Sequence, residues 1–448
     1  MGTLKISTSY GQIIKISLPI MIGSAAQNII ALTDSVFLYH YSEIDFAAIG
    51  FVSVFYLVIA AIGYGFSRAG QIIMARRKGE GDIRGIEKAF FSLVQFEVGM
   101  AIGIFIILQF FPEWIFSWFI EDPQIMESSL AYIKYRSWGV FFSYTGVAII
   151  ALYAAIARAK FIMIDTLVLV VSNIILNYVF IFGYGNIEEM GIAGAGLAST
   201  IAEGIAFVCF GIYMFFDNKV LKLRRQHIYI PKIQSIKAQF RLGWPIVVQT
   251  SIGLGSWVFF FGIVENLGMR TLAVANIARI VYLILSIPAW GYSAGIHTLV
   301  SQFIGYRKRQ AVIPIIWRTS FISFVTTMII SLPVVLFPTF FLYPLLGGED
   351  MSLIQEAKPV FVVVLAVMII FSVGSIFFSG MTGTGATFYG LKVQALITIV
   401  YLAYIYVAVN VFHGSLELAW TSEIFYWAAM LLTSIFYLRS KKWFHMKV

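Results

Sequence analysis

Charge is scarce in this sequence, because Asp, Glu, Lys and Arg together make up 12% of its 448 residues. Soluble proteins carry about 25%, so the composition is not that of a soluble protein. Cysteine occurs once, at Cys209, and an intramolecular disulfide cannot form. The sequence also lacks a His/Cys metal cluster, a nucleophile elbow and a GK[ST] phosphate loop, even in the glycine run 380–390. These absences predict a protein that is not an enzyme, has no cofactor and is not driven by ATP.

Hydrophobic residues, by contrast, make up 60% of the chain, with a mean hydropathy of +0.88. Long apolar runs follow one another, and most exceed the ~20 residues that a helix needs to cross the hydrocarbon core. We therefore expect an all-α polytopic membrane protein, embedded in the lipid bilayer, with twelve transmembrane helices. The expected spans are roughly 13–39, 46–74, 89–111, 130–157, 162–183, 191–216, 240–265, 272–303, 314–337, 359–381, 390–412 and 418–438.

Basic residues lie mainly in every second connection of this arrangement. They are frequent near the start of the chain, between the second and third spans, in the central connection and in the tail. The positive-inside rule therefore places both termini in the cytoplasm and the chain in the plasma (inner) membrane. The net charge of +9 follows from this asymmetry and does not indicate a nucleic-acid partner. The intervening, outer connections carry only Lys134, Arg136, Arg270 and Lys358.

The two halves of the chain repeat one another at a constant offset of 226 residues, which aligns Pro19 with Pro245 and Gly65 with Gly291. Six spans separate the copies, so both copies have the same orientation in the membrane. The sequence thus predicts two pseudo-symmetric six-helix lobes. They are an N-lobe over 1–216 and a C-lobe over 240–448 that ends in a basic cytoplasmic tail, joined by a basic cytoplasmic linker over 217–239.

One carboxylate, Asp34, lies inside the first apolar run, five residues before its end. A charged residue at the centre of a transmembrane helix costs about 2.5–3.5 kcal/mol on the insertion scale, so it normally faces a cavity or a partner. The repeat places Phe260 at the matching position, which indicates that the fold itself does not need an acid there. We expect Asp34 to bind a proton or a cation; the alternative is an acid that simply reaches interfacial water.

Polar side chains of the fifth and sixth spans are expected to accompany Asp34. Asn173 and Asn177 are spaced i, i+4 and therefore project from one face of a helix, as do Ser199 and Glu203. Asparagine also joins helices by hydrogen bonds within membranes, so a structural role is the alternative for the pair. Glu203, a second intramembrane carboxylate, is expected either to relay protons with Asp34 or to pair within the lobe.

The order of these features resembles the multidrug and toxic compound extrusion (MATE) family over essentially the whole chain. The resemblance rests on the proline-started first helix with Gln27 and Asp34, on NIILNYVFIFGYG at Asn173–Gly185, on GAGLAST at Gly194–Thr200 and on LGWP at Leu242–Pro245. It implies a twelve-helix, two-lobed, V-shaped exporter driven by a proton or sodium gradient. It also implies an N-lobe cation site at Asp34, Asn173, Asn177 and Ser199.

The sequence departs from the family in ways that concern the coupling ion. Some members carry acidic residues in the seventh and tenth spans, but VVQTSIGLGSW (247–257) and residues 361–387 contain none, so we expect no cation site in the C-lobe. Other members have an aspartate where Asn177 stands, and its absence favours protons over sodium. Na⁺ at Asp34, Asn173 and Asn177 is the alternative, and no other metal site is expected.

Further charged and polar residues lie within the expected spans. Arg68 and Glu97 lie at matching depths in a helical hairpin, roughly 12–13 Å from its cytoplasmic end, and are expected to form a structural ion pair. Arg279 has no carboxylate at equal depth. It is expected either to line the substrate cavity, together with Gln27 and Asn28, or to snorkel and bond to helix backbones.

Together these observations predict a secondary active multidrug antiporter that exports amphipathic small molecules in exchange for H⁺, or Na⁺, by alternating access, and that acts as a monomer. The alternative is a flippase for lipid-linked oligosaccharides or polysaccharides of the related exporter class, to which only Arg279 points. A non-transporting scaffold or passive channel is disfavoured, because the polar cluster is expected in only one of the two repeats.

Overall fold

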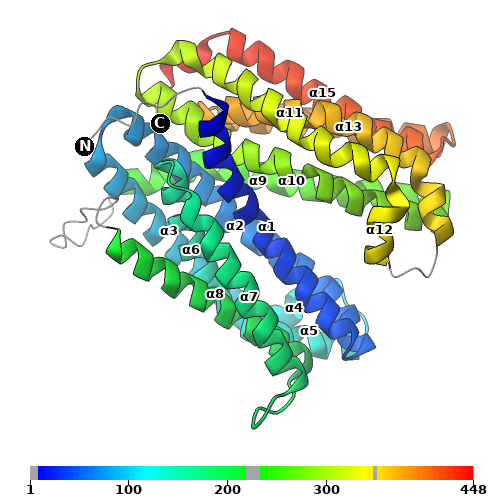
Figure 1. The fold of residues 1–448 in the computed structure, drawn as a ribbon. Helices are drawn as coiled ribbons and strands as arrows, with labels where there is room; N and C mark the ends of the chain where they lie inside the picture. The colour runs from blue at the N-terminus through cyan, green and yellow to red at the C-terminus, as the bar shows by residue number, and fades with distance from the viewer. Residues whose placement is uncertain (1–8, 218–232, 347–350, 447–448) are drawn as a thin grey trace. The chain divides into compact units, whose positions relative to one another are not determined.

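The structure is a computed structural model that describes residues 9–217, 233–346 and 351–446; within these ranges the side chains of 24–28, 233, 343–346, 351 and 445 are not described. The described part of the chain is almost entirely helical (Figure 1). The α-helices are α1 (Tyr10–Tyr39), α2 (Glu43–Glu80), α3 (Ile83–Phe110), α4 (Pro112–Phe116), α5 (Pro123–Arg136), α6 (Gly139–Ala155), α7 (Lys160–Phe182), α8 (Gly191–Phe216), α9 (Ile233–Val264), α10 (Met269–Gly305), α11 (Val312–Leu336), α12 (Pro338–Leu346), α13 (Met351–Gly383), α14 (Thr387–Tyr406) and α15 (Leu416–Arg439).

A helix lies over each of the twelve expected spans. Within the described residues, nine helices are long and apolar enough to cross a membrane, and a tenth span results if α5 and α6 are taken as one. These two helices meet at an angle of 51°, so the fourth expected span, 130–157, is a broken helix rather than a continuous one. The helices therefore support the prediction that the chain crosses the membrane several times.

The chain divides into two compact units, Ile22–Val247, which we call the N-unit, and Met1–Met21 with Val248–Val448, which we call the C-unit. The expected lobes assign the start of α1 to the first half and the start of α9 to the second. In the structure the assignment is reversed: the start of α1, up to Met21, belongs to the C-unit, and the start of α9, up to Val247, belongs to the N-unit. In both helices the change of unit follows two residues after an internal proline, Pro19 in α1 and Pro245 in α9.

The exchanged segments pack in repeat-equivalent ways. In the N-unit, a Cβ on Gly65 of α2 would collide with Val247, and in the C-unit a Cβ on Gly291 of α10 would collide with Met21. Gly65 and Gly291 are 226 residues apart, and so are Met21 and Val247. The repeat seen in the sequence is therefore also a repeat in packing, because each unit needs glycine at the same place to admit a helix close to the backbone.

In the N-unit, hydrogen bonds at the helix ends fix the positions of α5 and α8, two of the helices that supply donors to Asp34. Asp45, in the first turn of α2, accepts a hydrogen bond of 2.8 Å from Ser128 of α5 and one of 3.1 Å from the backbone N–H of Ile192 in α8. Asp122 caps α5 by accepting from two backbone N–H groups, and Pro123 follows at the first helical position. Helices α2, α5 and α8 are thereby tied together at one end.

Candidate functional site

Asp34 lies near the end of α1, in the part of that helix that belongs to the N-unit, and only 1% of its surface is exposed. Its Oδ1 accepts a hydrogen bond of 2.7 Å from Asn177 Nδ2 and a longer one of 3.4 Å from Asn173 Nδ2. Its Oδ2 accepts from Ser199 Oγ at 2.9 Å and from Tyr132 Oη at 3.4 Å. Donors from α5, α7 and α8 therefore surround one carboxylate.

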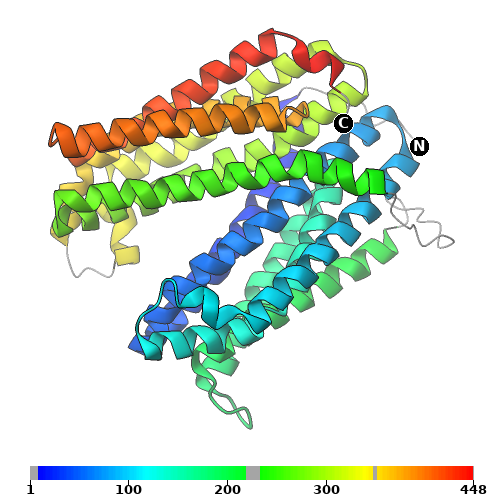
Figure 2. The same ribbon diagram turned by 180° about the vertical axis from the view of Figure 1, so that it is seen from behind.

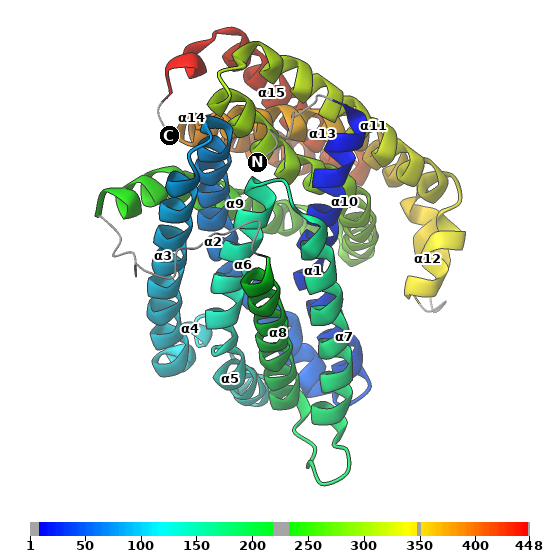
Figure 3. The ribbon, with the colours of Figure 1, turned by 60° about the vertical axis from the view of Figure 1, so that its left-hand side comes forward.

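The two asparagines reach Asp34 because they share the buried face of α7. Buried positions on this helix recur every three or four residues, and Asn173 and Asn177 are both fully buried. Helix α8 packs against α7, and Asn173 Nδ2 donates to Ser199 Oγ at 3.0 Å across that contact (Figure 3). The structure thus brings Asp34, Asn173, Asn177 and Ser199 into one hydrogen-bonded cluster.

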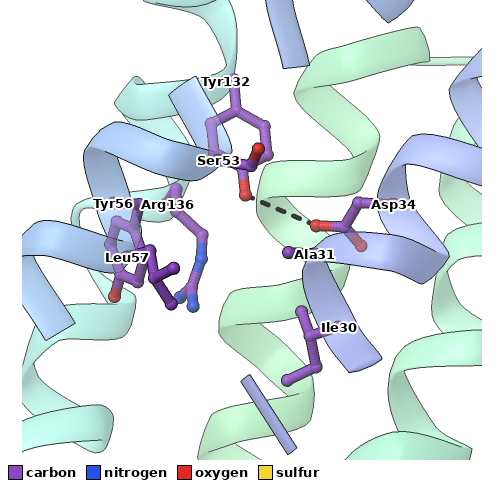
Figure 4. A pocket seen from close by; sticks show the side chains of 8 residues that line it. All are labelled: Ile30, Ala31, Asp34, Ser53, Tyr56, Leu57, Tyr132 and Arg136. Atoms are coloured by element: carbon purple, nitrogen blue, oxygen red, sulfur yellow. Dashed lines mark hydrogen bonds between the residues drawn. The ribbon is translucent and has the colours of Figure 1, made fainter. Parts of the chain in front are cut away.

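A small cavity of about 20 Å³ adjoins Asp34, lined by Ile30, Ala31, Asp34, Ser53, Tyr56, Leu57, Tyr132 and Arg136 (Figure 4). It has room for about one water molecule, whereas pockets for drug-sized molecules measure about 300–1,000 Å³. The cavity therefore suits a proton, a water or a small ion. Tyr132 and Arg136 lie one helical turn apart on α5, and both side chains border it.

Arg136 forms a buried ion pair beside this cavity. Its Nη1 and Nη2 each donate a hydrogen bond of 2.7 Å to Glu203 of α8, one to Oε2 and the other to Oε1. The guanidinium also lies over the ring of Tyr56, 3.7 Å from its centroid. Because only 1% of Arg136 is exposed, this two-bond pair is screened from water and is much stronger than a surface pair. Glu203 is therefore held by Arg136 and does not contact Asp34 as a partner.

The cluster can satisfy Asp34 in both protonation states. When the carboxylate is charged, its oxygens accept from the four donors described above. When it is neutral, its hydroxyl needs an acceptor, and Ser199 Oγ or an asparagine oxygen can serve. Among the described residues, Asn177 Oδ1 is buried and has no hydrogen-bond partner. The orientation of an amide is assigned from its hydrogen bonds, and a half-turn would point this oxygen at Asp34.

The described residues include no group of three or more His, Cys, Asp or Glu side chains that could hold a metal ion. A cation at Asp34 would have one carboxylate and the neutral oxygens of Asn173, Asn177 and Ser199 as ligands. Hard cations prefer several oxygen ligands, and divalent sites are usually rich in carboxylates. This donor set is therefore poor in charge, and the guanidinium of Arg136 lines the same cavity.

Comparison with known proteins decides the family. A family model described as MatE matches residues 19–179 and 245–410. The chain belongs to the MatE family. The two matches begin at Pro19 and Pro245, which are separated by the 226 residues of the internal repeat. With this assignment, the apolar helices described above belong to a multi-pass membrane protein of a transporter family.

Relatives of this MatE-family chain carry related names. It is 25% identical over 395 residues to a probable multidrug resistance protein NorM of Thermotoga maritima, covering 84% of this chain and 80% of the relative. It is 26% identical over 306 residues to a protein of the same name from Photorhabdus laumondii, and the match spans 65% of that relative's length. A solved outward-facing structure of a multidrug resistance MATE family transporter of the MOP superfamily has the same fold, with a TM-score of 0.87 at 17% identity, over 96% of this chain and 95% of that one.

The expected ion pair between Arg68 and Glu97 does not form in the described structure. Glu97 is fully buried and accepts a hydrogen bond of 2.8 Å from Ser67 Oγ, and its Oε2 has no partner among the described residues. The matching depth predicted contact, but Ser67 and Arg68 are consecutive in α2 and point about 100° apart around the helix. The neighbour of Arg68, rather than Arg68 itself, faces α3.

Of the expected substrate-cavity residues, only Arg279 has a side chain that the structure describes. Arg279 is an exposed residue of α10, and its guanidinium lies 5.1 Å from the ring centroid of Phe261. This contact is consistent with the alternative role of Arg279, in which its side chain snorkels along an apolar surface. The side chains of Gln27 and Asn28 fall outside the described residues, so their expected place stays a prediction.

Sequence reasoning missed four residues that the structure makes prominent. Arg136 was assigned to an outer connection and Tyr132 was not singled out, although their i, i+4 spacing on one helix is the signal that puts both beside the cavity at Asp34. Asp165 is buried on the same face of α7 as Asn173, and its Oδ1 has no partner among the described residues. Glu423 is buried in α15 of the C-unit. The C-unit therefore also contains a buried carboxylate, although Phe260 stands at the repeat position of Asp34 and the cluster of Asp34, Asn173 and Asn177 is not itself repeated.

Proposed function

We propose that this chain is a secondary active multidrug antiporter, which exports amphipathic small molecules in exchange for protons by alternating access. The observation that carries the proposal is the single buried carboxylate of Asp34, surrounded by four donors and bordered by a cavity of about 20 Å³. An ionisable group inside a membrane helix is expensive and therefore points to function. The names of the relatives support multidrug export.

Protonation is the event that would change the packing around Asp34. The charged carboxylate binds Asn177, Ser199 and Tyr132, which lie on three different helices. Hydrogen bonds to a charged group contribute about 1.5–3 kcal/mol each, and neutralising the carboxylate weakens all of them at once. In the proposed cycle, a proton arriving from outside loosens α1 from these helices and substrate leaves outward; release of the proton to the cytoplasm resets the site.

Protons rather than sodium are the proposed coupling ion. Asn177 supplies a neutral amide, and none of the described side chains that hydrogen-bond to Asp34 is a carboxylate. The Arg136 guanidinium on the cavity wall is paired with Glu203 and opposes any added positive charge, so the preference for a proton rests on the shortage of charged oxygen ligands around Asp34. One charge crossing 100 mV supplies about 2.3 kcal/mol, to which a pH gradient adds.

The proposed topology has twelve spans, both termini in the cytoplasm and the chain in the plasma (inner) membrane as a monomer. It is supported by the helices over all twelve expected ranges and by the basic residues of alternate connections. A lipid-linked oligosaccharide flippase was the alternative because of Arg279. That residue is exposed and lies on Phe261, and no contact of the described structure favours this second function.

Transport by purified protein in proteoliposomes tests the proposal. A cationic amphipathic dye on one side should drive proton movement without sodium, and Asp34→Asn should abolish that movement while the protein still inserts and folds. Glu43→Gln, an acid at the start of α2, is a matched control and should leave exchange unchanged. A strict sodium requirement would make the cluster a sodium site, and full exchange by Asp34→Asn would reject Asp34 as the coupling residue.

A further inference from the structure

The C-unit contains a buried carboxylate of its own, at Glu423 of α15. Only 4% of Glu423 is exposed, and its Oε1 accepts a hydrogen bond of 3.0 Å from Tyr401 Oη on α14. Tyr282 of α10 and Trp427 of α15 lie close enough to Glu423 to interact with it electrostatically. Trp427 Nε1 also donates to Tyr282 Oη at 3.3 Å, which leaves that hydroxyl free to donate in turn. Figure 2 shows α14 and α15 side by side.

No cation compensates Glu423 within the described part of the chain. The ionisable groups that face it are all tyrosines, namely Tyr401 from α14, Tyr282 from α10 and Tyr426 from α15 itself. Helix α13 also packs against α15, but after Lys358 in its second turn it contains no ionisable residue. Aromatic rings also contact Tyr282: Phe371 and Trp420 belong to the same buried cluster, and the partly buried Trp257 packs against it.

This surrounding chemistry fits a proton as the ligand of Glu423. The groups around the carboxylate are O–H and N–H donors, and in the part of the chain that the structure describes no second carboxylate stands beside it to share a metal ion. A tyrosine hydroxyl can donate to the charged carboxylate and can accept from the neutral acid. Both protonation states therefore have partners. An uncompensated carboxylate among aromatic rings is costly to keep charged, so its protonation responds to any change in packing or water access.

The location of Glu423 corresponds to that of the Asp34 cluster. In the order of expected spans, α7 and α8 are the fifth and sixth of the first half, and α14 and α15 are the fifth and sixth of the second. The donors to Asp34 come chiefly from α7 and α8, and Glu423 and its closest donor lie on α14 and α15. In each unit, therefore, the fifth and sixth spans supply donors to a buried carboxyl group, which comes from α1 in the N-unit and from α15 itself in the C-unit.

We propose that Glu423 is a second proton-binding site, which takes up and releases a proton during transport. The reaction is the addition of H⁺ from water to the carboxylate, with Tyr401 turning from donor to acceptor, and its reversal. This inference rests on the proposed function, in which Asp34 binds the first proton. Each transport cycle then moves one proton through the N-unit and one through the C-unit.

Infrared difference spectroscopy of the purified full chain tests the proposal independently of transport. Stepping the pH from alkaline to acidic should produce carboxylic acid C=O bands. Glu423→Gln should remove one band, Asp34→Asn should remove another, and Glu417→Gln, an acid in the first turn of the same helix, should remove neither of these two. Tyr401→Phe should shift the Glu423 band without removing it, which identifies the band even if Glu423→Gln does not fold.

Proton counting completes the test. Substrate binding to the wild type should release about two protons, and to Glu423→Gln about one, because glutamine imitates a permanently neutral acid. A Glu423→Gln variant with the wild-type bands and proton count would overturn the proposal and make Glu423 a structural, permanently neutral acid. If the Asp34 band is absent and the Glu423 band is present, the assigned coupling residue fails but this inference stands; the reverse pattern rejects only this inference.

Discussion

The Asp34 cluster of the N-unit and the Glu423 cluster of the C-unit each bury a carboxyl group, but they surround it with different side chains. Asp34 is held by amides and a small hydroxyl beside a cavity, and the buried pair Arg136–Glu203 lies next to it. Glu423 is held by the hydroxyl of Tyr401 in an aromatic cluster, with no neighbouring cation among the described residues. Amides offer a donor and an acceptor on the same group, so the N-unit site can also accept a cation, whereas the aromatic site offers only proton chemistry.

The largest expected loss of stability comes from removing the buried cation of the N-unit, Arg136, which leaves a buried carboxylate without a cation, as in the C-unit. Arg136→Met should lower the free energy of unfolding by about 3–5 kcal/mol, because it leaves the carboxylate of Glu203 buried without its partner. The measurement is the apparent Tm of the purified protein in detergent. The double variant Arg136→Met/Glu203→Met should regain most of the loss. Equal Tm values for the single and double variants would show that Arg136 does not stabilise Glu203.

The second prediction sharpens the difference in ligand chemistry. Asn177→Asp places a second carboxylate 2.7 Å from the position of Asp34 Oδ1, and two adjacent carboxylates repel unless they share a proton or a cation. We expect exchange by this variant to become stimulated by sodium, whereas the wild type is indifferent to it. The check is dye efflux from proteoliposomes with sodium or with choline. A variant that stays indifferent to sodium would contradict the role given to the neutral amide.

The third prediction compares one hydroxyl in each unit. Tyr401→Phe removes a bond of 3.0 Å to Glu423, and hydrogen bonds to charged groups are worth about 1.5–3 kcal/mol. Tyr132→Phe removes a bond of 3.4 Å to Asp34, which keeps three other donors. We expect the loss of stability for Tyr401→Phe to be the greater of the two, by a few degrees in Tm. A greater loss for Tyr132→Phe would contradict the idea that Glu423 depends on its tyrosine.

The smallest effect is expected at Arg68. Because no ion pair joins it to Glu97 in the described structure, Arg68→Met should change the free energy of unfolding far less than Arg136→Met does, by about 1 kcal/mol or less. The measurement is again the apparent Tm. Exchange of the two charges, Arg68→Glu with Glu97→Arg, should not preserve stability. If the variant with both charges exchanged were as stable as the wild type, the ion pair predicted from the matching depth of Arg68 and Glu97 would be supported instead.

The helices and the shared face of Asn173 and Asn177 follow from one-dimensional spacing, whereas the contact of these residues with Asp34 was implied by the family resemblance. Apolar runs give helix ranges, and i, i+4 spacing places Asn173 and Asn177 on one face. Sequence spacing does not determine how a helix is rotated about its axis, and therefore which of its residues face a neighbouring helix. That is why Arg68 was assigned to Glu97 although Ser67 makes the contact. It is also why Arg136 was assigned to a loop although the bend of 51° after it buries the side chain.

Loss of a proton from Asp34 when substrate binds is the central event of the proposed exchange. The decisive measurement counts protons released into a weakly buffered detergent solution with a pH indicator, as a cationic amphipathic substrate is added in the absence of sodium. Wild-type protein should release protons in proportion to bound substrate, and Asp34→Asn should bind substrate but release at least one proton fewer. Equal release by the two proteins would contradict the account, because the exchanged proton would then come from elsewhere in the chain.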